Sequence, residues 1–171
     1  MSKTRFEAPL TSPKVVAYGT KPILVLSNAA SMALPSRGMV VVAGTANGFA
    51  FQSVVEPDGN GSHWFQVDEA FLKGTGAKLG DTVIVELEPI KEWPEPKVPA
   101  DLQAVLEGDA VALAVWNDIT VMARWDWIRW IGAVKQAETR KKRVESIPSR
   151  MMAGKRRPCC FDRSQCTLTE A

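Results

Sequence analysis

A proline-rich stretch divides the chain into two parts with different patterning. Residues Glu92–Pro99 read EWPEPKVP, and their three prolines can join neither the ladder of a sheet nor the interior of a helix. The residues before this stretch carry strand signals, and the residues after it follow helical spacing. We therefore expect a β domain over 1–91, a linker over 92–99, a helical segment over 100–148 and a basic, cysteine-containing tail over 149–171.

The first part has the pattern of short strands joined by tight turns. Two β-branched or aromatic runs, Met39–Thr45 and Phe49–Glu56, flank Ala46-Asn47-Gly48, and Asn-Gly supplies the positive φ angles of a type I′ hairpin turn. A glycine-rich turn then leads into a strand over Ser62–Val67, and a last strand is expected over Thr82–Leu87.

One pattern occurs twice within this β part. In each occurrence a strand is followed by one or two helical turns, a glycine break and another strand. The first copy spans 23–45, with Ser27 or Asn28 as the helix N-cap, and the second spans 62–87, with Asp68 as the N-cap. We expect a small closed β-barrel built from two similar halves, since closure removes exposed strand edges.

Beyond the linker, four apolar stretches have helical spacing. They are Asp101–Glu107, Asp109–Trp116 before the turn Asn117-Asp118, a segment from Thr120 weakened at Gly132, and Ala137–Ile147 continuing to Pro148. Short helices joined by tight turns indicate a small helical hairpin or bundle packed on the barrel. The predicted fold class is therefore α+β, and the tail from Ser149 is expected to add little to a core.

The charges are distributed unevenly along the chain. Residues 1–118 hold 9 Lys/Arg and 14 Asp/Glu, whereas residues 119–171 hold 12 and 5. The basic C-terminal third could meet nucleic acid, an acidic partner or an anionic surface, although a solvated helix face is the more common reason for such charge. The N-terminus has no signal-like apolar region and no apolar run is long enough to span a bilayer, so we expect a cytoplasmic protein.

The sequence offers little for catalysis. His63 is the only histidine, which argues against a multi-histidine metal site or a Ser-His-Asp triad. The carboxylates are scattered, and the segment Gly74–Asp81 lacks the Lys-Ser/Thr ending of a phosphate-binding loop. We expect a protein that is not an enzyme and that uses no cofactor.

The three cysteines lie together in the tail. Cys159, Cys160 and Cys166 could supply thiolates to zinc or copper(I), or form a redox-sensitive thiol beside nearby arginines. A fourth ligand is missing, however, and the spacing is not that of a zinc knuckle. Exposed thiols on a semi-ordered tail are the simpler interpretation.

Tryptophans and arginines are interleaved in the helical part. Four tryptophans lie between Trp116 and Trp130, with Arg124 and Arg129 among them. Their spacing places them on more than one helical face, so one or two should be core and another could contact a ligand or the barrel. Arginine stacked on tryptophan serves stability and nucleic-acid binding equally.

A series of segments resembles known families. In the first part these are Gly44–Gly48, Pro57–Trp64 and Leu79–Val83, which resemble a small barrel domain of unknown function. In the second part they are Val98–Leu102, Ala123–Ile131, Glu138–Arg143 and Gly154–Phe161, which resemble the YdeI/OmpD-associated, or bacteriocin-protection, family.

This resemblance implies a double-split type of β-barrel related to AbrB-like swapped-hairpin folds. The family name records an association with bacteriocin tolerance and an outer-membrane porin. It implies no reaction, cofactor or catalytic residue.

We therefore predict a non-enzymatic binding or stress-protection module for an unknown small molecule or protein partner. Its groove is expected where the barrel meets the helices, lined by Arg37, His63, Trp64, Arg124, Trp127 and Arg140. Nucleic-acid binding through the basic third and thiol-based metal or redox chemistry at the cysteines are the alternatives.

Overall fold

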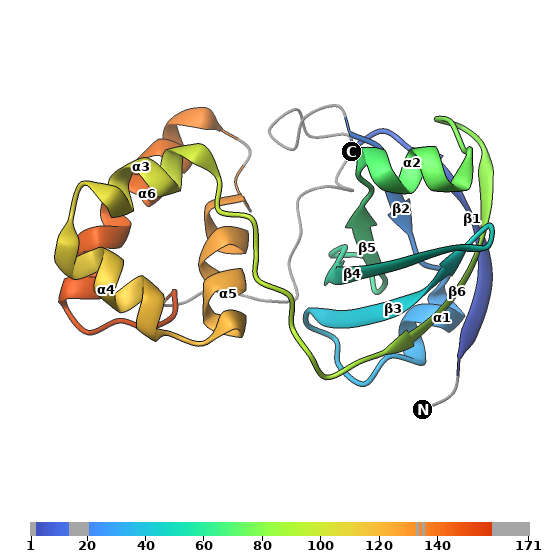
Figure 1. Ribbon diagram of the computed structural model, residues 1–171, viewed down its shortest axis with the longest axis horizontal. Coiled ribbons are helices and arrows are strands. Elements are labelled where there is room, and N and C mark those ends of the chain that lie inside the picture. Colours follow the sequence, from blue (N-terminus) through green and yellow to red (C-terminus); the bar gives the residue numbers. More distant parts are fainter. Residues whose placement is uncertain (1–2, 14–20, 133, 135, 159–171) are drawn as a thin grey trace. The chain divides into compact units, whose positions relative to one another are not determined.

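The computed structural model describes residues 3–13, 21–132, 134 and 136–158 (Figure 1). The described residues divide into two compact units, with the division between Glu92 and Trp93 in the proline-rich stretch. No helix among these residues is long and apolar enough to cross a membrane.

The first unit is a closed six-stranded barrel with two short helices. Its elements are β1 (Thr4–Thr11), β2 (Ile23–Val25), α1 (Asn28–Met32), β3 (Val40–Ala46), β4 (Phe49–Pro57), β5 (His63–Gln66), α2 (Glu69–Thr75) and β6 (Thr82–Pro89). Around the barrel the strand order is β1-β2-β5-β4-β3-β6, and every neighbouring pair is antiparallel. The predicted α+β fold with a small closed barrel is confirmed.

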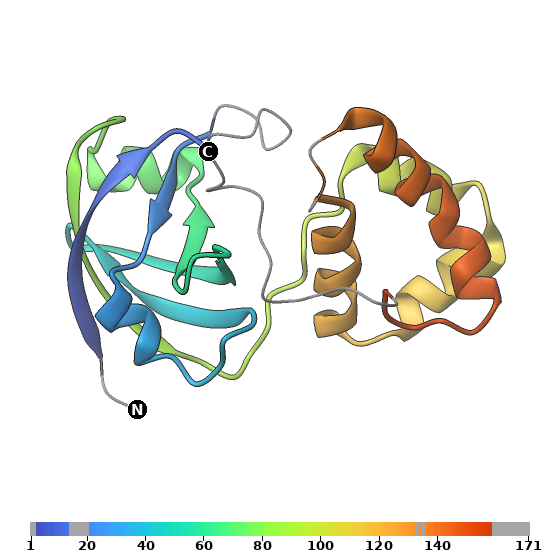
Figure 2. The same ribbon diagram turned by 180° about the vertical axis from the view of Figure 1, so that it is seen from behind.

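The topology has the two-half construction expected from the sequence. If β1 is exchanged with β4, β2 with β5 and β3 with β6, the set of neighbouring strand pairs around the barrel stays the same. Each half also contains the expected unit of strand, short helix and strand, as β2-α1-β3 and as β5-α2-β6. In both views α1 and α2 lie well apart on the barrel (Figures 1 and 2).

Local signals determine the turn and the helix starts. Asn47 and Gly48 both have positive φ angles, 47° and 83°, and Ala46 pairs with Phe49 across them, which confirms the type I′ hairpin. The Ser27 hydroxyl caps α1, and the Asp68 carboxylate accepts a 2.8 Å hydrogen bond from the Phe71 amide at the start of α2. These caps satisfy backbone donors that the first helical turn leaves open.

Strand β1 is an element that the sequence analysis missed. Its burial alternates, with Phe6, Ala8 and Leu10 buried and Glu7 exposed. The alternation is weak in sequence because alanine and proline contribute little strand signal. Pairing with β6 from Thr4↔Leu87 to Pro9↔Thr82 makes it a full member of the barrel.

The barrel encloses its own hydrophobic core. The core residues come from all six strands and from both helices, and each large one contributes about 1.5–3 kcal/mol on full burial. The fully buried side chains among them include Leu10, Leu24, Val42, Val55, Val83 and Val85.

The second unit contains four helices. They are α3 (Ala100–Glu107), α4 (Ala110–Asp118), α5 (Val121–Gly132) and α6 (Ala137–Met152). Their shared core is built around Leu102, Leu106, Trp127, Ile131 and Ile147.

Two predicted helix ends are wrong. Helix α4 continues through Asn117 to Asp118, and α6 passes Pro148 and ends at Met152. Proline lacks the amide that would bond back one turn, but Ile147 and Met151 on either side of it are buried in the helical core. Packing therefore outweighs the local cost of the proline, and the start of the predicted tail belongs to α6.

Candidate functional site

The barrel opens where two neighbouring strands diverge. Strand β4 pairs with β3 from Ala46↔Phe49 to Val40↔Val55, but it pairs with β5 only at Glu56↔Trp64 and Pro57↔His63. The first half of β4 therefore has no strand partner on its β5 side among the described residues.

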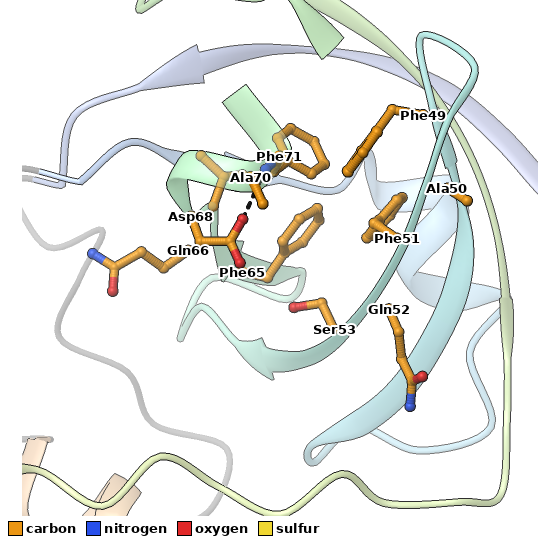
Figure 3. Close-up of a pocket in the computed structure, with 11 residues that line it drawn as sticks. Phe49, Ala50, Phe51, Gln52, Ser53, Phe65, Gln66, Asp68, Ala70 and Phe71 are labelled. Atoms are coloured by element: carbon orange, nitrogen blue, oxygen red, sulfur yellow. Dashed lines mark hydrogen bonds between the residues drawn. The ribbon is translucent and has the colours of Figure 1, made fainter. Parts of the chain in front are cut away.

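A pocket of about 190 Å³ lies at this gap, between β4, β5 and α2 (Figure 3). Four phenylalanine rings from the three elements gather around it. They are Phe49, Phe51, Phe65 and Phe71.

The rings form a contacting cluster. Phe51 stacks on Phe65 with the ring centroids 5.5 Å apart, and the Phe71 ring meets the Phe51 and Phe65 rings edge-on at 5.4 and 6.0 Å. Both arrangements are favourable for aromatic pairs. Phe49 and Phe51 stay partly exposed, so the cluster presents ring surface to the pocket as well as to the core.

Strand alternation and one glycine position these rings. Phe49, Phe51 and Ser53 are two residues apart and so project to the same face of β4. At Gly74 in α2 an added Cβ would lie 2.1 Å from the Phe49 ring. Glycine at this position therefore lets α2 pack directly against the ring.

Only some polar groups of the pocket can form hydrogen bonds to a ligand. The Asp68 carboxylate is committed to capping α2, and the amide ends of Gln52 and Gln66 point away from the rings (Figure 3). The pair Ala46↔Phe49 closes the two-residue turn, so the backbone groups of Phe49 and Phe51 face β3 and those of Ala50 and Gln52 face the gap. The hydrogen-bonding capacity of the pocket therefore lies mainly in this backbone edge and in the Ser53 hydroxyl.

Two of the predicted site residues, Arg37 and His63, are joined through Ser31. Arg37 donates to the Ser31 hydroxyl at 3.1 Å and also to its carbonyl. The Ser31 hydroxyl lies 2.7 Å from His63 Nδ1, and His63 Nε2 lies 2.8 Å from the Gly38 carbonyl. A carbonyl can only accept, so Nε2 carries the proton and, in the neutral ring, Nδ1 accepts from the serine.

His63 and Trp64 are interior residues. Their exposed fractions are 1% and 4%, and the Trp64 indole donates to the Pro57 carbonyl at 3.2 Å. Neither ring offers an exposed surface to a ligand.

The three predicted residues of the helical unit support the packing of its helices. Arg124 pairs with Glu95 at 2.6 Å and donates to the Ile119 carbonyl after α4. Trp127 is fully buried, and its indole donates to the Arg156 carbonyl at 3.0 Å. The groove predicted where the barrel meets the helices stays a prediction.

Arg140 pairs with Asp101, at 2.9 Å, between α3 and α6. The hydrogen bond and the positive charge of Arg140 hold the pKa of Asp101 below its usual value, against the opposing effect of burial. Both side chains line a second cavity, of about 350 Å³, together with alanines and valines of α3 and α6.

The phenylalanine pocket was not among the sites predicted from the sequence. Phe49 and Phe51 were visible as alternating strand residues, but alternation marks core residues and pocket residues alike. How far β4 and β5 pair is a property of the folded barrel, and neither strand carries a sequence signal for it.

The cysteine prediction lies outside the described residues. Cys159, Cys160 and Cys166 belong to 159–171, so the metal or redox interpretation stays a prediction. Among the described residues, no group of three or more His, Cys, Asp or Glu side chains is placed to hold a metal ion.

Two family models match the chain, one for each unit. Residues 6–87 match a domain of unknown function (DUF1905), and residues 95–154 match the family described as bacteriocin-protection, YdeI or OmpD-associated. No curated protein matches the chain significantly. The first match spans the barrel, and the second spans all four helices. The helical part of the chain thus matches the bacteriocin-protection, YdeI or OmpD-associated family model, and the barrel part matches the model of a domain of unknown function.

Proposed function

We propose that the protein is a non-enzymatic, cytoplasmic binding module whose barrel pocket holds a small, flat and largely apolar ligand. The observation that carries this proposal is the phenylalanine-lined pocket beside the stretch of β4 that has no strand partner on its β5 side among the described residues. It combines apolar ring surface with backbone hydrogen-bonding groups, as ligand sites commonly do.

The size of the pocket limits what it can take. Its volume of about 190 Å³ is below the roughly 300–1,000 Å³ of sites for drug-sized ligands. A single ring system or one side chain of a larger partner fits this space, and a dinucleotide or a haem does not.

The chemistry of the pocket favours an aromatic group with one polar edge. The ring surfaces of Phe49 and Phe51 can stack on a flat ligand. The N–H and C=O groups of Ala50 and Gln52 can bond its polar edge, because both face the gap between β4 and β5.

Two further observations support a binding role rather than a catalytic one. The only histidine is buried, and both of its ring nitrogens have hydrogen-bonding partners within the barrel. The description of the matching family names bacteriocin protection, and a protein that protects by sequestering a compound needs affinity rather than chemistry.

A screen of aromatic fragments by thermal shift tests the proposal. The matched variants are Ala70→Phe, which fills the pocket mouth from an exposed position on α2, and Ala29→Phe, which adds the same ring at an exposed position on α1. Fragments that stabilise the wild type should also stabilise Ala29→Phe but should not stabilise Ala70→Phe.

Either of two results would contradict the proposal. In the first, no fragment binds the wild type. In the second, Ala70→Phe keeps the full shift, which would place the bound fragments elsewhere.

A further inference from the structure

Two arginines of α6, Arg143 and Arg150, differ from several other arginines of the helical unit, which pair with carboxylates. Within the described residues, Arg124 pairs with Glu95, Arg140 with Asp101, Arg156 with Asp118 and Arg157 with Asp126, each within 4 Å. Arg143 and Arg150 have no carboxylate partner among the residues that the structure describes.

Both of these arginines are held on the same ring. The guanidinium carbons of Arg143 and Arg150 lie 4.8 and 5.0 Å from the centroid of Trp130. The two residues are seven apart, about 10.5 Å along the helix axis, and therefore project from the same face of α6. Cation–π contact with a buried indole fixes both charges in place.

Neither guanidinium has used its full hydrogen-bonding capacity. Arg143 donates through Nη1 to the Trp130 carbonyl at 2.6 Å, and so provides a donor for one carbonyl in the last turn of α5. Arg150 donates through Nε to the Ser146 hydroxyl at 3.2 Å. A guanidinium carries five N–H donors in a planar fork, so each side chain retains donors for a further acceptor.

The two positive charges also repel each other. Burial lowers the pKa of Arg143, and the charge of Arg150 lowers it further. Lys142, exposed on the adjoining part of the helix surface, adds a third positive charge without a carboxylate partner among the described residues. A bound anion would relieve this repulsion.

We propose that Arg143 and Arg150 on α6 form a binding site for the phosphodiester backbone of a single-stranded nucleic acid. Guanidinium forks match phosphate oxygens, and cations arranged along one helix suit a linear polyanion. Trp130 is buried, so its role is to position the arginines rather than to stack on a base. The site lies in the helical unit and is independent of the barrel pocket.

Fluorescence anisotropy with a labelled single-stranded oligonucleotide tests this site across a series of salt concentrations. Arg150→Gln is the main variant, because Arg150 makes no bond to the end of α5. Lys141→Gln is the matched control: it removes one exposed positive charge from α6, and position 141 is on the opposite side of the helix from position 150. Thermal unfolding of each variant checks that the fold is retained.

We expect the affinity for the oligonucleotide to fall as the salt concentration rises. Arg150→Gln should weaken binding about tenfold. It should also reduce the slope of log affinity against log salt concentration by about 0.7, the value for one phosphate of a single strand. Lys141→Gln should bind within about twofold of the wild type. Arg150→Lys should keep the salt slope but recover only part of the affinity, since lysine keeps the charge and loses the fork.

Three outcomes would overturn the proposal. One is the absence of binding at low salt, and another is an equal loss in Arg150→Gln and Lys141→Gln. The third is competition by polyglutamate as effective as that of unlabelled oligonucleotide, which would indicate an acidic protein partner. Inorganic phosphate at millimolar concentration should compete only weakly, because it supplies one phosphate instead of a strand.

Discussion

At the scale of single residues, His63 is held inside the barrel by hydrogen-bonding partners at both of its ring nitrogens. In the sequence it is the only histidine, and it follows a glycine-rich turn. Its burial depends on Ser31 and Gly38, which lie 32 and 25 residues away in sequence. No local pattern predicts that these partners meet the ring, and the same limit applied to Trp127, whose indole bonds the distant Arg156 carbonyl.

Ser31→Ala tests the importance of this buried network. The substitution removes the hydroxyl that bonds His63 Nδ1 and accepts from Arg37, which leaves a buried ring nitrogen without that partner. Such a loss costs about 1–3 kcal/mol, and we expect a decrease of that size in the free energy of barrel unfolding, measured by denaturation with circular dichroism. Asn28→Ala, at an exposed position of α1, should change it by less than about 0.5 kcal/mol. Equal effects of the two substitutions would show that the network adds nothing.

At the scale of elements, local sequence signals predicted where helices begin and where the hairpin turns better than they predicted where helices end. The Asn47-Gly48 hairpin and the Asp68 cap depend on residues within a few positions of each other, and both are confirmed. The end of α6 depends instead on burial of Met151 against other helices. In the sequence, Pro148 indicates an earlier helix end. The missed strand β1 has the same cause, because it is defined mainly by its pairing with β6.

The Asp101–Arg140 pair links α3 to α6 and should make their packing sensitive to acid. The pKa of Asp101 is lowered in the fold, chiefly by the hydrogen bond from Arg140. The ionised carboxylate therefore stabilises the fold above the ordinary pKa of 3.8, and this contribution is lost as the pH falls through the lowered value. Both side chains are partly exposed, so the contribution is at most about 1 kcal/mol.

Asp101→Asn measures this contribution. At neutral pH the wild type should have the higher free energy of unfolding, and the difference should shrink as the pH falls below 3.8. Tryptophan fluorescence is a suitable probe because five of the six tryptophans lie in the helical unit. A difference that stays constant from neutral to acid pH would argue against an ionic role for Asp101.

At the scale of the whole molecule, the proline-rich stretch predicted the division into two parts. The barrel core contains only residues between Phe6 and Leu87, and the core of the helical unit only residues between Leu102 and Met151. Sequence could predict this division because the change from strand signals to helical spacing extends over long segments. It could not predict the pocket, which arises from the partial pairing of β4 and β5.

Separate cores imply that the barrel can fold alone. A fragment of residues 1–92 should show a cooperative unfolding transition and dispersed amide resonances, although a domain of this size has a modest stability margin. A fragment that is unfolded at room temperature would show that the helical unit contributes to barrel stability.

Ligand binding in the phenylalanine pocket can be tested by a nuclear magnetic resonance titration of the full chain. The ligand is an aromatic fragment taken from the thermal-shift screen. Binding in the pocket should give intermolecular contacts from the fragment to the rings of Phe49, Phe51, Phe65 and Phe71, together with shifts of the Ala50 and Gln52 amides. These changes should disappear in Ala70→Phe. Contacts confined to other parts of the chain, or unchanged spectra at saturating fragment, would contradict binding in the pocket.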